Sequence, residues 1–193
     1  KDMNESNMEG IINLAKEKST SLDLTLRSQN RDWTWQVNLF FNQIQDYILG
    51  QSIDSNDDGR ADLIDDEGEV TIADGALLLI NYTQQDANFY GVEAATTFKL
   101  GRATIGELDG RLSFDYVRAK LADGENLPRI TPLRFGVGLD YHRGNWTSIL
   151  DVFHVFDQNK NSPLEDQTKG YTLLEASISF VMFKNNAEYE FSL

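Results

Sequence analysis

The chain has 193 residues, with 31 Asp and Glu against 17 Lys and Arg, a formal net charge of -14 and no Cys. Its acidic balance argues against a nucleic-acid partner, because phosphates require clustered basic side chains. The lack of Cys excludes disulfides, thiolate metal sites and a cysteine nucleophile. No apolar run reaches the roughly 18 residues that a membrane-spanning helix needs, and the first residues lack the apolar segment of a signal peptide.

Apolar and polar residues alternate along about eight segments of the chain. This pattern is typical of antiparallel strands that have one apolar and one polar face. In chain order, the segments are residues 22–26, 33–41, 90–98, 112–116, 133–141, 146–152, 174–182 and 189–193. The sequence therefore predicts an all-β fold, an antiparallel meander of about eight strands.

Short and long connections alternate between these segments. The long ones are predicted at about residues 49–76, 122–132 and 157–170, and the short ones at 28–32, 101–107, 143–145 and 184–187. In an antiparallel meander, alternate connections lie at the same end of the sheet. One end with tight turns and another with long loops is typical of outer-membrane barrels, so we expect part of a transmembrane β-barrel with a long extracellular loop at about 49–76.

Aromatic and charged residues agree with a barrel. Aromatic rings lie beside the short turns and beside the long loops, as they do at the two interfaces of a membrane, although strand ends of a soluble core explain them equally well. Charged residues fall on the face opposite the apolar sets, where a barrel has its wet lumen. The aromatic residues are Trp33, Trp35, Tyr141 and Trp146, then Tyr47, Phe156 and Tyr171; the charged ones are Asp23, Glu93, Asp115, Asp140, Asp151 and Glu175.

From about Ser19 to Leu193, the chain resembles the C-terminal part of the barrel of TonB-dependent outer-membrane receptors. The segments that carry the resemblance are "NLFFNQIQDYI", "FYGVEAATTFKL", "LDGRLSFDYVRAKLADGENLPRITPLRFGVGLDY" and "EDQTKGYTLLEASISF". The resemblance implies that residues 1–193 are a partial β-barrel from a larger receptor, whose plug domain and final strands lie outside this chain.

The resemblance also implies a function and a place. A complete receptor of this kind would lie in the bacterial outer membrane, in contact with its lipid, and would actively import a small ligand such as an iron chelate, a metal, a vitamin or a sugar. Energy would come from an energy-coupling protein that acts through the plug. With two His and no Cys, we expect no dedicated site for a soft metal within this segment.

Residues 54–65, "DSNDDGRADLID", carry five acidic side chains and are called the acidic loop here. Their spacing matches the ligand positions of an EF-hand calcium loop, with Gly59 at the sixth position and Asp in place of the usual Glu at the twelfth. The matched residues are Asp54, Asn56, Asp58, Arg60 through its carbonyl, Asp62 and Asp65, and Asp66 or Glu67 could substitute for Asp65 at the last position. The sequence thus predicts a calcium site, with a solvated acidic loop as the alternative.

Two other classes of protein were weighed. A soluble, secreted, calcium-binding β-sandwich used in adhesion or carbohydrate binding would also alternate apolar and polar residues, because it too buries one face of each strand. An enzyme is not expected: His142 and His154 stand at the ends of different strands, and the chain contains neither G-x-S-x-G nor a phosphate-binding glycine loop.

Overall fold

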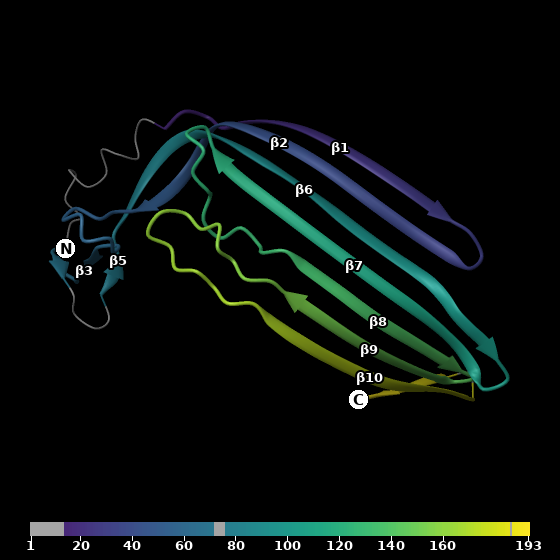
Figure 1. Cartoon of the computed structure of the whole chain (residues 1–193). Helices are drawn as coiled ribbons and strands as arrows, with labels where there is room; N and C mark the ends of the chain where they lie inside the picture. Colours follow the sequence, from purple (N-terminus) through teal and green to yellow (C-terminus); the bar gives the residue numbers. More distant parts are fainter. Residues whose placement is uncertain (1–13, 72–75, 186) are drawn as a thin grey trace.

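The computed structural model describes residues 14–71, 76–185 and 187–193, and its regular elements are all β-strands (Figure 1). Eight strands form one sheet in chain order, each antiparallel to the next. They are β1 (Lys18–Gln29), β2 (Trp33–Ser52), β6 (Ile80–Ala103), β7 (Gly106–Leu121), β8 (Arg134–Arg143), β9 (Trp146–Val155), β10 (Tyr171–Lys184) and β11 (Ala187–Ser192). In these residues, no helix is long and apolar enough to cross a membrane.

The predicted meander is confirmed. Each of the eight segments read from the sequence lies on one of these strands, apart from Leu133 and Leu193, which lie one residue outside β8 and β11. The strands form because side chains at every second position share one face of the sheet. The alternation in the sequence therefore gives the sheet one apolar face and one polar face.

The pairing of the strands lines up the apolar positions from one strand to the next. Leu39 of β2 pairs with Leu24 of β1 and with Val92 of β6, and farther along the sheet Leu139 of β8 pairs with Leu150 of β9. The result is an apolar face that crosses the sheet, and many of its side chains are exposed, among them Leu24 at 51% and Leu150 at 41%. The opposite face, called the polar face here, carries Glu93, Asp115 and Asp151.

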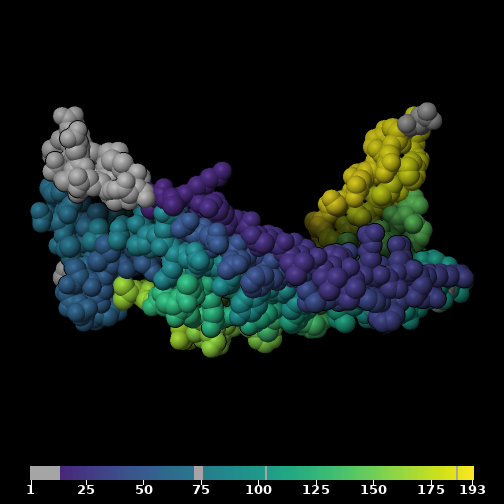
Figure 2. Space-filling model, turned by 90° about the horizontal axis from the view of Figure 1, so that it is seen from above, coloured from purple at the N-terminus to yellow at the C-terminus, as the bar shows by residue number. Residues whose placement is uncertain are grey.

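The sheet is curved rather than flat. Figure 2 shows the last strands rising away from the plane of the first ones, and Figure 1 shows the β2–β6 hairpin continuing beyond the other strands and bending. A bulge lies in β2 between Ile44 and Tyr47, where Asp46 has a φ of 53°. Such a bulge bends a strand and increases its twist, which explains why the hairpin turns at this end of the sheet.

The long connection between β2 and β6 has structure of its own. Since β2 continues to Ser52 and β6 begins at Ile80, the connection comprises residues 53–79, of which 72–75 lie outside the described residues. It holds a small sheet in the order β4 (Val70–Thr71), β3 (Leu63–Ile64) and β5 (Leu77–Leu78). At its base, Asp62 N donates to Ile53 O at 2.7 Å and Leu79 N donates to Asp62 O at 2.9 Å.

A small apolar cluster lies on the polar face near the same end. Its buried members are Leu49, Ala87, Ala119, Leu121 and Leu127, and the rings of Tyr47 and Phe89 pack against it with centroids 5.6 Å apart. Leu127 comes from the connection between β7 and β8 and is only 2% exposed. This connection, residues 122–133, therefore folds back over the polar face instead of extending away from the sheet.

Candidate functional site

The polar face is organised around a cation that bridges two carboxylates. Arg111 of β7 places Nε 2.8 Å from Asp140 Oδ2 on β8 and Nη2 3.0 Å from Asp151 Oδ1 on β9. Arg134 forms a second pair with Asp115, with Nε 2.8 Å from Oδ2. Both pairs offset the repulsion between acidic side chains that stand on neighbouring strands.

A glycine makes the first pair possible. The strand that separates Arg111 from Asp151 is β8, and at the position opposite both residues it carries Gly138. A Cβ at this glycine would lie 3.0 Å from Arg111 Nη2 and would also meet the carboxylate of Asp151. The missing side chain leaves space for the guanidinium group to reach across β8.

Two long connections meet at the end of the sheet opposite the tight turns. They are residues 122–133, between β7 and β8, and residues 156–170, between β9 and β10. Hydrogen bonds join them: Phe156 N donates to Leu133 O at 2.9 Å, Asn126 Nδ2 to Asn161 O at 3.2 Å, Arg129 N to Glu165 Oε1 at 3.2 Å, and Gln158 Nε2 to Ile130 O at 2.6 Å. These contacts hold the two connections together at the mouth of the polar face.

Two cavities open among these connections. The larger, of about 690 Å³, lies between the β2–β6 hairpin and both connections, and is lined by Tyr47, Leu78 and Pro128 among others. The smaller, of about 330 Å³, lies between the two connections and the adjoining ends of β8, β9 and β10. Both volumes fall within the range of small-molecule sites, about 300 to 1,000 Å³.

The first half of the acidic loop is a tight turn in which three predicted calcium ligands come together. The Asp54 carboxylate accepts hydrogen bonds from Asp58 N at 3.1 Å and from Gly59 N at 2.8 Å. Asn56 Oδ1 also accepts from Asp58 N, at 3.0 Å, and Asp58 Oδ1 accepts from Arg60 N at 2.9 Å. The side chains of Asp54, Asn56 and Asp58 thus share one hydrogen-bonded turn.

The second half of the acidic loop directs its carboxylates elsewhere. Asp62 is 6% exposed, and its Oδ2 accepts hydrogen bonds from Ser55 N at 2.9 Å and Ser55 Oγ at 2.5 Å. These bonds lower the pKa of Asp62 below its ordinary value of 3.8. Asp65 Oδ1 accepts from Glu67 N and Glu69 N at 3.0 and 2.9 Å. Across the described residues, no cluster of three or more acidic, His or Cys side chains is placed to hold a metal ion, and calcium stays a prediction.

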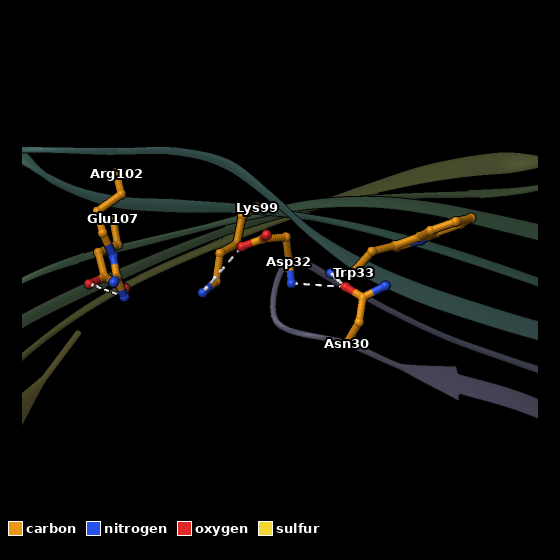
Figure 3. A network of polar contacts seen from close by, with 6 residues as sticks. All are labelled: Asn30, Asp32, Trp33, Lys99, Arg102 and Glu107. Carbon is orange, nitrogen blue, oxygen red and sulfur yellow. Dashed lines mark hydrogen bonds and ion pairs between the residues drawn. The ribbon is translucent and has the colours of Figure 1, made fainter.

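The opposite end of the sheet has the tight turns (Figure 3). In the turn between β1 and β2, Asn30 Oδ1 accepts hydrogen bonds from Asp32 N at 3.0 Å and Trp33 N at 2.8 Å. Lys99 Nζ lies 3.9 Å from Asp32 Oδ1, while Trp33 Nε1 donates to Thr96 Oγ1 at 2.6 Å. The turn and its aromatic residue are therefore tied to the neighbouring strand β6, as expected for the short-turn end.

Several residues of these sites were not singled out from the sequence. Arg111 and Arg134 neutralise the acidic residues of the polar face, and Arg129 and Lys169 line the smaller cavity. Their roles depend on strand register and on two connections that meet in space. In the sequence, Arg111 and Arg134 were marked only by lying on strands that also carry acidic residues. Arg129 and Lys169 were marked only by lying in long connections.

Comparisons with known proteins identify one family by sequence and a solved structure of the same fold. A sequence model described as "TonB dependent receptor-like, beta-barrel" matches residues 3–188. A solved structure titled "Copper transporter OprC" has the same fold, with a TM-score of 0.68 and 20% identity over 88% of this chain. This chain spans 24% of that one, about a quarter of its length.

The family match confirms the resemblance read from the sequence, and with it the expectation that the chain is not an enzyme. A partial barrel explains the geometry, because in such barrels an apolar face is suited to lipid and a polar face to the lumen. Since the match extends over nearly the whole sequence, the chain belongs to the TonB-dependent receptor-like β-barrel family and is a segment of a bacterial outer-membrane β-barrel.

Proposed function

We propose that the complete protein actively imports a small ligand across the outer membrane, and that this segment forms one wall of its barrel. The observation that carries the proposal is the two-faced single sheet. Its apolar side chains are exposed on one face, while ion pairs such as Arg111–Asp140 and Arg134–Asp115 lie on the other. A wall of this kind suits a protein with lipid outside and a polar passage inside.

The ligand enters, in this proposal, at the end where the long connections meet. The two cavities there are lined by residues from different connections, so a ligand bound in them would contact several parts of the chain at once. The ligand classes under consideration are an iron chelate, a metal, a vitamin or a sugar. Energy would be delivered by an energy-coupling protein acting on a plug domain, and outer-membrane lipid would be the partner of the apolar face.

A soluble β-sandwich explains the structure less well. A sandwich needs a second sheet packed on the apolar face of the first. Within the described residues, the second sheet consists of three strands of two residues each, placed in the connection between β2 and β6. Side chains such as Leu22 and Leu174 of the large sheet are 71% and 70% exposed. In the proposal, lipid covers them.

We also propose that the acidic loop binds calcium and thereby orders the connection 53–79. Support comes from the sequence spacing and from the turn that gathers Asp54, Asn56 and Asp58. Carboxylate and amide oxygens are the ligands that calcium prefers. Calcium would need the carboxylate of Asp62 or Asp65 to turn toward this group.

The import function can be tested in cells that make the full-length receptor and lack related receptors. Uptake of labelled candidate ligands is measured with and without a protonophore, and in a strain without the energy-coupling protein. We expect surface binding to persist and accumulation in the cell to be lost in both cases. Equal accumulation in all three conditions would identify a passive channel and contradict the proposal.

A further inference from the structure

The smaller cavity at the long-connection end has an unusual charge. It lies on the polar face, where Arg134 and Tyr171 pair with Val155 at the ends of β8, β10 and β9. Three cationic residues line it, Arg129, Arg134 and Lys169, against one acidic residue, Glu165. In the whole chain the balance is reversed, with 31 acidic residues against 17 basic ones. The cavity is therefore a local concentration of positive charge in an acidic protein.

Two of these three cations are not neutralised. Arg134 is paired with Asp115 at 2.8 Å. The Glu165 carboxylate is already engaged, since its two oxygens accept hydrogen bonds from Arg129 N and Ser162 N, both at 3.2 Å. Among the described residues, the Arg129 guanidinium and the Lys169 ammonium group have neither an ion pair nor a hydrogen-bond partner. Both groups can thus bind an anion without breaking an existing contact.

The backbone at Arg129 adds to this. Arg129 has a φ of 59°, in the left-handed region that residues other than glycine rarely adopt. Its N–H group is bonded to Glu165, which ties this conformation to the neighbouring connection. Strained backbone of this kind is concentrated at binding and catalytic sites, where surrounding contacts hold it in place. The backbone from which the Arg129 side chain extends is therefore held in place by contacts of both connections.

The other residues that line the cavity indicate which further groups the ligand carries. The side chain of Tyr171, 51% exposed, offers aromatic surface beside the charges. Asn161 Oδ1 is buried and has no hydrogen-bond partner among the described residues. An unpaired buried acceptor is destabilising, and a hydrogen bond from a ligand hydroxyl or amide would remove that penalty. The cavity thus offers cations, an aromatic wall and one acceptor.

We propose that this cavity binds a small organic anion with two or more carboxylate groups, as the ligand of the import function proposed above. Arg129 would hold one carboxylate through two parallel N–H groups, and Lys169 would hold another as a point charge. At about 330 Å³, the cavity suits a compact molecule or the anionic part of a larger one. The proposal rests on the proposed function, because it takes the bound anion to be the imported ligand. The experiment that tests it measures binding and does not require import.

The test uses the purified full-length receptor in detergent and isothermal titration calorimetry with propane-1,2,3-tricarboxylate. The neutral triamide of the same acid is the matched ligand control. The variants are Arg129→Gln and Lys169→Gln, and the matched control variant is Lys160→Gln, which removes the same charge from the same connection at a residue outside the cavity lining. We expect each cavity variant to weaken binding of the tricarboxylate at least about tenfold and the control to change it less than about twofold.

The proposal is overturned if the wild-type receptor fails to bind the tricarboxylate, if the triamide binds as tightly, or if the double variant with both cations removed keeps wild-type affinity. A thermal unfolding curve of each variant checks that it is folded. Energy-dependent import is measured separately, as described above. The receptor could import its ligand with the energy-coupling protein and yet fail to bind the tricarboxylate. This result would contradict the anion site and leave the proposed function supported.

Discussion

The ring of Phe153 lies against Gly136 on the neighbouring strand, so closely that a Cβ added to the glycine would be 2.8 Å from Phe153 Cδ1. The two residues are directly paired between β8 and β9, on the polar face. The aromatic ring covers a stretch of backbone that would otherwise have no side chain above it. This packing explains why the Phe153 ring is found on the polar face, apart from the apolar cluster that contains Tyr47 and Phe89.

Replacing Gly136 by Ala should therefore destabilise the barrel. The new methyl group forces both the Ser113 hydroxyl and the Phe153 ring to move, and overpacking of this kind costs about 1 to 3 kcal/mol. Gly101→Ala is the control, because a Cβ there would have no atom of the described residues within 4 Å. Urea unfolding of the full receptor in detergent measures both. Equal stability of the two variants would contradict the packing described here.

Removal of Arg111 should also reduce stability. Arg111→Met leaves the carboxylates of Asp140 and Asp151, whose side chains are 19% and 15% exposed, facing each other without a cation. Loss of charged hydrogen bonds at a half-buried site costs about 1.5 to 3 kcal/mol. Arg102→Met is the control: its pair with Glu107 is exposed, at 57% and 44%, and should contribute little to stability because solvent screens it. The same urea experiment compares the two.

A charge on the apolar face should be penalised by lipid. Leu150 lies in the middle of β9 on this face, and Leu150→Arg should lower the free energy of unfolding by about 2 to 4 kcal/mol. Ser177→Arg on β10 is the matched control, because its side chain is exposed on the polar face. The comparison is made with the receptor folded into phospholipid vesicles. A similar loss in both variants would mean that the face does not meet lipid.

The strands were predicted well from the sequence because each has one apolar and one polar face. The prediction of strand ends failed where the positions on the apolar face change from odd to even. Before the bulge of β2, even-numbered residues such as Asn42 lie on the polar face; after it, odd-numbered residues such as Tyr47 and Leu49 do. Because of this reversal, the alternation seen before the bulge does not mark the end of the strand. The connection was predicted to begin at residue 49 rather than 53. The two-residue strands β3, β4 and β5 are too short to show a period at all.

The polar face shows the same division. Asp140 and Asp151 were assigned to it from alternation alone, and they lie there. Their cation, Arg111, was not found, because it reaches Asp151 across the whole of β8 and past Gly138. Such a contact depends on strand order and register, which a single sequence does not contain.

Calcium should stabilise the connection 53–79 if the acidic loop binds it. We expect a dissociation constant of about 10⁻⁴ to 10⁻³ M, as in extracellular calcium modules, because one carboxylate of a usual loop is replaced by an amide and another is shortened. Asp54→Ala should abolish binding, since its carboxylate forms the centre of the turn. Glu69→Ala, which removes an exposed acidic residue of the same connection outside the matched positions, is the control. Calorimetry on the full receptor that detects no heat at millimolar calcium would contradict the prediction.

The hydrogen bonds between Ser55 and Asp62 should make this connection sensitive to acid. They lower the pKa of Asp62 below 3.8, so the folded state binds a proton less readily than the unfolded chain. Their contribution to stability is therefore complete above the unfolded pKa and is lost as the pH falls through the lower, folded pKa. Ser55→Ala removes the hydroxyl bond and should raise the pKa of Asp62 toward its ordinary value.

The measurement is a titration of ¹³C-labelled aspartate carboxyl groups by NMR, from about pH 6 to about pH 2, with the Asp62 signal assigned from an Asp62→Asn sample. Ser21→Ala is the control, because Ser21 donates to Asn42 and not to an acid. Its Asp62 signal should titrate as in the wild type. An unchanged Asp62 titration in Ser55→Ala would show that the hydroxyl does not hold the carboxylate, and the base of the acidic loop would then depend on its backbone bonds alone.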